Sequence, residues 1–179
     1  WYYLIFYMKF ILIFFYFSNI ILFQGCVTAQ IKFQTVSGNK GNYTLDIPPN
    51  YYLKESIGAN IDLKFVNSDG ASIITVVKKL PVGLAENFIN AFNEVSDQQL
   101  VDQYESSGLE NISILKRGFI TINNVNSYFI YYTDGVLYHH SIFQWKNGIN
   151  LNFTYTCEYK NKALFMPYIF RVVNSLKHK

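Results

Sequence analysis

Hydrophobic and polar residues alternate most regularly between residues 118 and 158, in three runs rich in aromatic and β-branched side chains. Asp134-Gly135 and Asn147-Gly148 separate these runs. Asp-Gly and Asn-Gly are preferred two-residue hairpin loops, because a type I′ turn requires positive φ at both central positions. The pattern therefore predicts a three-stranded antiparallel meander.

Two-residue loops fix the register of the meander and the face on which each side chain lies. They would pair Tyr131 with Tyr138 and Ile142 with Phe153. One face is then apolar and predicts a core: Phe129, Tyr131, Tyr138, His140, Ile142, Leu151, Phe153, Tyr155 and Cys157. The opposite face is apolar on two strands but carries Asn150, Asn152, Thr154, Thr156 and Glu158 on the third. We expect a helix or loop to cover only part of this second face.

The remaining pattern predicts strands at 31–36, 42–47, 61–66, 71–80 and 112–122, with a loop at 50–60. Helical spacing appears at 84–94 and at 162–176, where Pro167 fits best within the first turn. Ser96 is a candidate N-cap for a short helix that ends at Gly108. Strands, helices, strands and a final helix together predict an α+β fold, an antiparallel β-sheet with helices packed on it.

Residues 1–29 read as a targeting segment. Met8-Lys9 precedes an apolar run, and Val27-Thr28-Ala29 supplies the small residues of a signal-peptidase site. We interpret 1–29 as a signal peptide, with residues 1–7 upstream of the true start Met8. Residues 30–179 are then a single domain, exported to the periplasm or secreted.

Two alternatives change the location of the protein. The apolar run 10–23 could remain as a membrane anchor, although it is short for a span of about 20 residues. Cys26 could instead be acylated, which would make the protein a lipoprotein. Cleavage after Ala29 leaves Cys157 as the single cysteine, which excludes an intramolecular disulfide. We interpret Cys157 as a buried small hydrophobe rather than a catalytic thiol.

Composition and charge exclude several classes of function. Hydrophobic residues make up 50% of the chain, enough for a full core. The formal net charge of +3 is scattered, without the basic stripe that nucleic-acid binding requires. Lys78-Lys79 and Lys116-Arg117 are interpreted as solvated strand-end charges rather than an anion site. We expect no nucleic-acid partner, and contact with a membrane only through the signal segment or an acylated Cys26.

No motif for catalysis, cofactor binding or metal ligation is recognisable. His139 and His140 are neighbours on one strand and point to opposite faces, so they cannot chelate one metal together without a β-bulge. His140 is interpreted as a buried, hydrogen-bonded core residue beside Tyr155. We assign no catalytic, cofactor or metal residue. The candidate ligand or partner surface comprises Tyr51, Tyr52, His139 and Trp145.

Several short phrases recur in one known family: Asp46-Ile47-Pro48-Pro49, then Ile122-Asn123-Asn124-Val125, and a last helix that ends in Asn174-Ser175-Leu176. With the order of the elements, they resemble the PsbP-like superfamily, which includes the Ran-binding Mog-type proteins and many small exported bacterial proteins. The family carries a glycine where Asn124 stands, and Asn also tolerates positive φ. The resemblance covers residues 31–177 and implies an αβα sandwich. No functional residue is carried over from the family.

The resemblance implies a binding or accessory module, and the absence of a catalytic motif favours the same class. We expect an exported, non-enzymatic bacterial protein with an unknown protein or small-molecule partner in the cell envelope. The alternative is a small-molecule or lipid carrier with an aromatic-lined cavity of at least about 300 Å³. A hydrolase based on His140 or Cys157 is the third reading.

Overall fold

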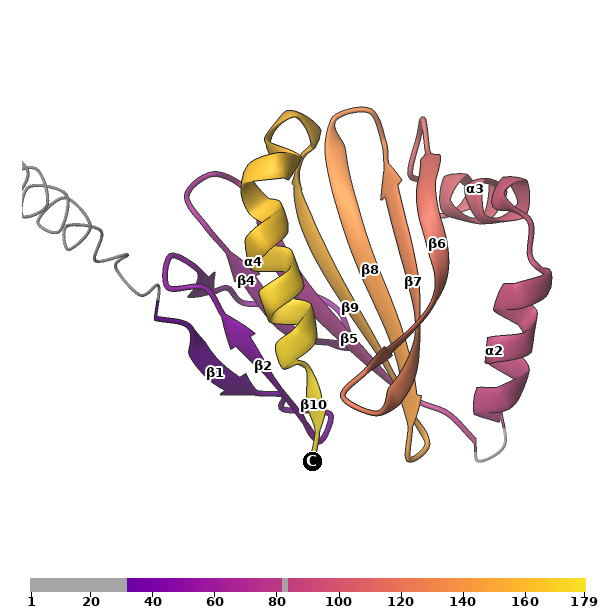
Figure 1. Ribbon diagram of the computed structural model, residues 1–179, viewed down its shortest axis with the longest axis horizontal. Helices are drawn as coiled ribbons and strands as arrows, with labels where there is room; N and C mark the ends of the chain where they lie inside the picture. Colours follow the sequence, from indigo (N-terminus) through magenta and orange to yellow (C-terminus); the bar gives the residue numbers. More distant parts are fainter. Residues whose placement is uncertain (1–31, 82–83) are drawn as a thin grey trace, which may run out of the picture. The chain divides into compact units, whose positions relative to one another are not determined.

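The computed structural model describes residues 32–81 and 84–179 (Figure 1). The alternating segment forms four consecutive antiparallel strands, β6 (Ser113–Ile122), β7 (Val125–Thr133), β8 (Leu137–Lys146) and β9 (Ile149–Glu158). The predicted meander is therefore confirmed and extended by one strand. The predicted signal peptide, its start at Met8, the possible anchor and Cys26 lie outside the described residues.

The four strands belong to a seven-stranded antiparallel sheet with the order β3-β4-β5-β9-β8-β7-β6. Its other strands are β3 (Tyr52–Leu53), β4 (Ile61–Val66) and β5 (Ser72–Lys79). A second sheet of three strands has the order β1-β2-β10. It consists of β1 (Gln34–Ser37), β2 (Tyr43–Ile47) and β10 (Lys177–His178).

The helices agree with the predicted spacing. They are α2 (Leu84–Glu94), α3 (Asp97–Ser106) and α4 (Lys162–Ser175), with a 3₁₀ turn η1 (Tyr159–Asn161) before α4. Pro167 lies inside α4, beyond its first turn, and its ring is exposed to solvent. Because α4 begins at Lys162, as predicted, Pro167 lies in the second turn of the helix, one turn deeper than the position that was predicted to suit it best.

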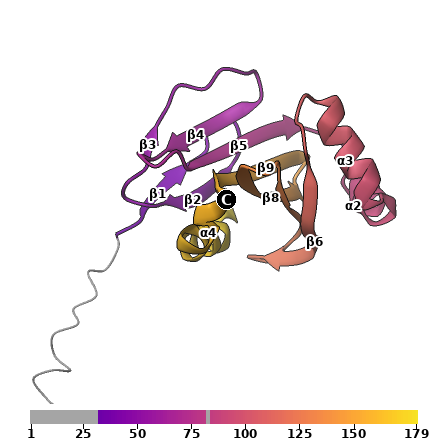
Figure 2. The same ribbon diagram turned by 90° about the horizontal axis from the view of Figure 1, so that it is seen from above.

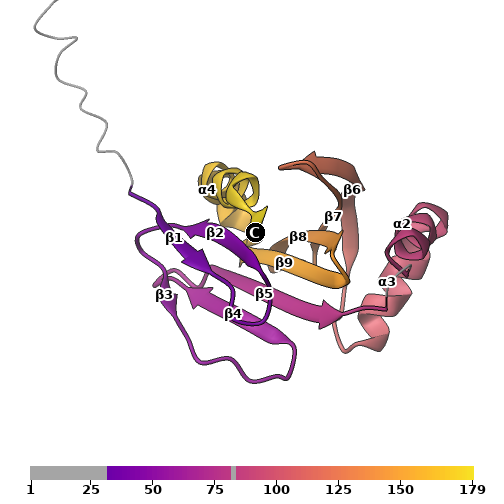
Figure 3. The ribbon, with the colours of Figure 1, turned by 90° about the horizontal axis from the view of Figure 1, so that it is seen from below.

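The two faces of the large sheet are covered by different elements (Figures 2 and 3). On one face, α4 and β2 enclose the main core with residues of β5, β8 and β9. On the other face, α2 and α3 pack against β7 and β8. The structure is thus an α+β fold in which helices pack on antiparallel sheets, as the sequence predicts.

The meander follows the predicted faces but not the whole predicted register. Between β8 and β9, Ile142 pairs with Phe153 as expected. Between β7 and β8, Tyr131 pairs with His140 rather than with Tyr138. The reason is Asp134, whose carboxylate accepts hydrogen bonds from the main-chain N–H groups of Val136 and Leu137 and forms a longer turn. The shift is two residues, so each side chain keeps its predicted face.

The tight turns depend on asparagine in the left-handed region. Asn147 has φ of 53° and is followed by Gly148 at 72°, as the Asn-Gly hairpin requires. Asn123 and Asn124 have φ of 47° and 63°, so Asn-Asn forms the β6–β7 turn in the same way. This turn confirms that Asn124 can replace the glycine of the related phrase.

Two short strands were missed from the sequence. The predicted loop 50–60 contains β3, which pairs with the edge of β4 at Tyr52 and Leu53. After α4, β10 pairs with β2. Two-residue strands carry too few alternating positions to be recognised in a sequence. No helix within residues 32–81 and 84–179 is both long and apolar enough to span a membrane.

Candidate functional site

Helices α2 and α3 cover only part of one face of the large sheet. Helix α3 packs over β7 and part of β8, whereas the side chains of β9 on this face remain half-buried. A cavity of about 380 Å³ lies at the boundary, and we call it the groove. Its lining residues are Lys78, Phe92, Leu100, Gln103, Tyr104, Ser107, Ile130, Tyr132, Ser141, Phe143, Asn152 and Thr154.

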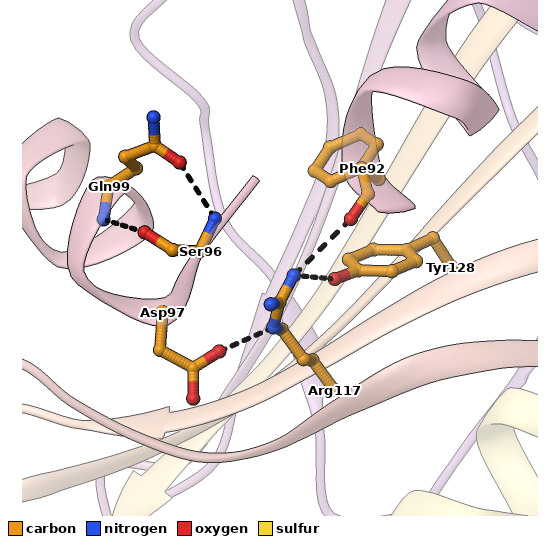
Figure 4. A network of polar contacts seen from close by, with 6 residues as sticks. All are labelled: Phe92, Ser96, Asp97, Gln99, Arg117 and Tyr128. Atoms are coloured by element: carbon orange, nitrogen blue, oxygen red, sulfur yellow. Dashed lines mark hydrogen bonds and ion pairs between the residues drawn. The ribbon is translucent and has the colours of Figure 1, made fainter. Parts of the chain in front are cut away.

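The position of α3 is fixed first by its own sequence. The Ser96 hydroxyl accepts a hydrogen bond from the Gln99 main-chain N–H at 3.2 Å, and the Gln99 side chain accepts one from the Ser96 N–H at 2.8 Å. This reciprocal pair is a capping box, which satisfies N–H groups that a helix start leaves free. The prediction that Ser96 is the N-cap is confirmed (Figure 4), and the box fixes the start of α3, which carries Leu100 and Tyr104 of the groove lining.

Arg117 of β6 joins both helices to the sheet (Figure 4). Its Nη1 donates to the main-chain carbonyl of Phe92 at 3.2 Å and to the hydroxyl of Tyr128 at 3.0 Å. Its Nε lies 2.5 Å from a carboxylate oxygen of Asp97, at the start of α3. One planar guanidinium group therefore connects the end of α2, the start of α3 and two strands.

Tyr104 and Tyr132, which line the groove, belong to a stack of three rings. Tyr104 of α3 lies on Tyr132 of β7, with ring centroids 4.6 Å apart. Tyr132 in turn lies on His139 of β8, at 4.5 Å and with the rings 11° from parallel. The Nδ1 atom of His139 is 3.1 Å from the hydroxyl of Thr156 on β9. The stack thus runs from α3 across β7 and β8, and the hydrogen bond of His139 joins it to β9.

The floor of the groove consists of hydroxyl and amide groups. Ser141 and Thr154 lie opposite each other on β8 and β9 and share a hydrogen bond of 2.9 Å. The Thr154 hydroxyl also lies 3.4 Å from the side-chain oxygen of Asn152. A smaller cavity of about 100 Å³ continues from Asn152 and Phe143 toward Asn150, and Lys78 lines both cavities.

The described lining of the groove carries a single charge. Lys78 is the one charged side chain among the described lining residues, and it forms no ion pair with a described residue. Burial raises the pKa of Tyr132 to about 12 and also raises the pKa of Tyr104, so both hydroxyls are neutral at pH 7. The groove therefore presents one cation on a neutral polar surface.

The four residues of the predicted surface do not form one site. Tyr51 and Tyr52 lie at the β3 edge, where Tyr51 is half-buried with its hydroxyl against that of Tyr155, and Tyr52 is exposed. Trp145 is buried beneath α2, with its ring 5.6 Å from Phe92. None of the four lines the groove, and His139 lies behind Tyr132, a lining residue on which it stacks.

His140 and Cys157 are both in the main core, as predicted. His140 is 1% exposed and lies opposite Tyr155, with Nδ1 3.4 Å from the Tyr138 hydroxyl. Burial lowers the pKa of His140 to about 3, so the ring is neutral. Burial also raises the pKa of the Cys157 thiol to about 11. Neither residue reaches the groove, and the described chain groups no three His, Cys, Asp or Glu side chains as metal ligands.

Sequence reasoning missed Lys78, Tyr104 and Asn152. Lys78 was predicted to be a solvated strand-end charge, and it is exposed near the end of β5, but its place in the groove lining was not foreseen. Tyr104 was predicted only as part of the apolar face of a helix. The available signal was the polar third strand of the meander, Asn150 to Glu158, whose uncovered face is the floor of the groove. What the sequence could not provide is the pairing of β9 with β5, which brings Lys78 opposite Asn150.

Several solved structures are similar to this chain and indicate its fold. Cyanobacterial PsbP from Synechocystis sp. PCC 6803 aligns with a TM-score of 0.61 and 15% identity, over 87% of this chain and 96% of that protein. The Ran-binding protein Mog1p of Saccharomyces cerevisiae aligns with a TM-score of 0.53 and 10% identity, over 83% and 96%.

A third similar structure is LpqN of Mycobacterium tuberculosis, a protein involved in cell envelope biogenesis. It aligns with a TM-score of 0.51 and 11% identity, over 83% of this chain and 91% of LpqN. No family model and no curated protein sequence matches the chain. The likeness is one of three-dimensional arrangement, and it gives this chain the PsbP/Mog1-like fold.

Proposed function

We propose that the protein is an exported, non-enzymatic binding module that contacts its partner through the groove. The observation that carries this proposal is the half-covered sheet face, where α3 ends and a polar floor continues. Ligand sites in proteins are concave and combine apolar walls with a few placed polar groups. The groove has this composition, with Phe92, Leu100 and Phe143 as walls.

The titratable groups of the groove favour binding over catalysis. General acid–base chemistry needs a group that changes protonation near neutral pH, such as histidine or a shifted carboxyl. Among the described lining residues the ionisable side chains are Lys78 and two tyrosines of raised pKa. His139 is screened from the cavity by Tyr132, on which it stacks.

A carrier of small molecules is the second candidate, favoured by the volume of the groove. At about 380 Å³ the cavity lies at the lower end of the range of ligand pockets, about 300 to 1,000 Å³. Its hydroxyl and amide floor suits a polar ligand better than an acyl chain, because a buried amide without a partner costs free energy.

We propose the cell envelope or its exterior as the location. Support comes from the pattern of residues 1–29, which is typical of a signal peptide. LpqN, which shares the fold, is involved in cell envelope biogenesis. Mog1p, which also shares it, binds the protein Ran, so a protein partner suits this architecture.

Site-specific photo-crosslinking in the native cells tests the proposal. A benzophenone side chain replaces Gln103, an exposed residue of α3 that lines the groove. The matched control replaces Gln98, an exposed glutamine of the same helix that does not line it. Intact mass of the irradiated protein reports an adduct of any size, whether a protein or a small molecule.

We expect a defined adduct from position 103 and none from position 98. A protein-sized adduct supports the accessory module, and an adduct below about 1 kDa supports the carrier. Equal adducts from both positions, or no adduct from position 103, would overturn the groove as the contact surface.

A further inference from the structure

Polar atoms without a hydrogen-bond partner lie where the groove meets the smaller cavity. The side-chain oxygen of Asn150 is buried and accepts no hydrogen bond from the described residues. The amide nitrogen of Asn152 and the ammonium group of Lys78 likewise have no acceptor in the described part of the chain. Buried polar groups in proteins are almost always paired, so the unpaired oxygen of Asn150 indicates a missing ligand. The exposed Lys78 ammonium and the half-buried Asn152 amide are free to bind the same ligand.

The strand register places these three groups together. Lys78 of β5 lies directly opposite Asn150 of β9, and Asn152 is two residues further along the same face. Residues opposite each other in an antiparallel pair have neighbouring side chains. One ligand can therefore reach the cation, the amide donor and the acceptor at once.

An apolar ring stands beside this polar group. Phe143 of β8 lies opposite Asn152, is half-buried and lines both cavities. Phe92 supports it at a centroid distance of 5.5 Å, and Trp145 stacks on it at 6.4 Å. The ligand therefore meets an aromatic surface on one side and hydrogen-bonding groups on the other.

We propose that the groove binds a saccharide that carries a carboxylate group. The carboxylate would pair with Lys78, the ring hydroxyls would bond with Asn150 and Asn152, and the apolar face of the sugar ring would lie on Phe143. The groove has no acidic lining residue that would repel such a ligand. A fatty acid would leave the amides unpaired, and a nucleotide would bring more charge than one lysine matches.

This inference rests on the proposed function, because it assigns a ligand class to the same groove. Two disaccharides test the carboxylate and the sugar separately. Cellobiouronic acid carries a carboxylate where cellobiose carries a hydroxymethyl group, and the two are otherwise the same. Hexanoate serves as a carboxylate without a sugar. The fluorescence of Trp145, whose ring stacks on Phe143, gives the binding signal for the protein purified from its native cell fraction. The amide chemical shifts of Phe143 and Asn152 give a second signal.

The variants are chosen as matched pairs. Lys78→Gln removes the cation of the groove. Lys79→Gln removes the same charge from the next residue, which is exposed like Lys78 but points to the other side of β5. Asn150→Leu replaces an unpaired buried acceptor with an apolar group of similar size. That change is expected to leave folding stability unchanged or higher while weakening both disaccharides, because an unpaired acceptor stabilises only when a ligand binds it.

We expect cellobiouronic acid to bind about tenfold more tightly than cellobiose, and hexanoate to bind more weakly than either. In Lys78→Gln the two disaccharides should bind equally, and in Lys79→Gln the tenfold difference should remain. Equal binding of both sugars by the wild-type protein would overturn the carboxylate assignment. Preference for hexanoate, or no saturable change in either signal at millimolar sugar, would overturn the saccharide. An adduct at position 103 together with no sugar binding would retain the proposed function and reject this ligand class alone.

Discussion

The side-chain amide of Asn123 donates hydrogen bonds to the main-chain carbonyls of Asn174 and Leu176, at 2.9 and 2.8 Å. Asn123 belongs to the β6–β7 turn, and the two carbonyls lie at the end of α4, 51 and 53 residues later in the chain. The last carbonyls of a helix have no partner within the helix. One turn residue thus supplies both a left-handed conformation and the cap of a distant helix.

Asn123→Gly should therefore destabilise the protein although glycine suits the turn. The variant keeps positive φ but loses two hydrogen bonds, so we expect the free energy of unfolding to fall by about 1–2 kcal/mol. Asn124→Gly is the matched control, because Asn124 shares the turn conformation and makes no such bonds. It should change stability by less than about 0.5 kcal/mol. Urea denaturation measures both, and equal losses would show that the bonds to α4 contribute nothing.

Arg117→Met should loosen α2 and α3 without unfolding the sheet. The variant removes the bonds to Phe92, Tyr128 and Asp97 (Figure 4). Because the Asp97 side chain is 64% exposed, that ion pair is screened by water, and we expect a total loss of about 1 kcal/mol. Hydrogen exchange should accelerate in α3 and the end of α2. In Lys116→Met, which removes the neighbouring exposed charge, exchange in α3 should stay as in the wild type.

The sequence predicted those parts of the fold that depend on local pattern. Side chains within a few residues of each other determine three such features. They are the limits of α2, the N-cap at Ser96, and the pairing of β8 with β9 through the Asn147-Gly148 turn. The Asp134 turn was predicted two residues too short. The preference of Asp-Gly for a two-residue loop does not take into account that the Asp134 carboxylate can accept hydrogen bonds from the N–H groups of Val136 and Leu137.

The candidate site was harder to predict because it depends on contacts between distant segments. The polar positions of β9 were recognised as partly exposed, and that was the one correct indication. The cation comes from β5 and the wall from α3, which are brought to β9 by sheet order and by Arg117. Trp145, which was included in the candidate surface, is buried, since nothing in a strand's own sequence says which part of a face a helix covers.

The buried histidine makes stability depend on pH. Burial lowers the pKa of His140 to about 3 in the fold, whereas an unfolded histidine titrates near 6.5. Between these values the unfolded chain binds more protons, so the contribution is complete above pH 6.5 and is lost as the pH falls toward 3. At pH 5 the loss should be about 2 kcal/mol relative to pH 7.

Urea denaturation of wild type and His140→Gln at pH 7 and pH 5 measures this effect. The variant has no imidazole to protonate, so its stability should fall by about 2 kcal/mol less over the same interval. His178→Gln is the control at a half-buried histidine, whose pKa burial also lowers, and it should remove a smaller part of the dependence. A pH dependence unchanged by His140→Gln would mean that water reaches His140 in the fold.

The cysteines report both the packing of the core and the processing of the amino terminus. Cys157 is fully buried and free, and burial raises its pKa to about 11. Because the thiolate is the reactive form, Cys157 should not react with a thiol reagent in the native protein at pH 8. In denaturant the count of reactive thiols should be one if residues 1–29 have been removed, and two if Cys26 remains with a free thiol.

We expect one reactive thiol and an intact mass that begins at Gln30, in the soluble periplasmic or secreted fraction. A membrane fraction with one thiol and an added acyl mass on Cys26 would instead identify the lipoprotein, because acylation blocks that thiol. Two thiols would contradict cleavage after Ala29. Rapid reaction of one thiol in the native, cleaved protein would contradict the burial of Cys157, since no other cysteine would then be present.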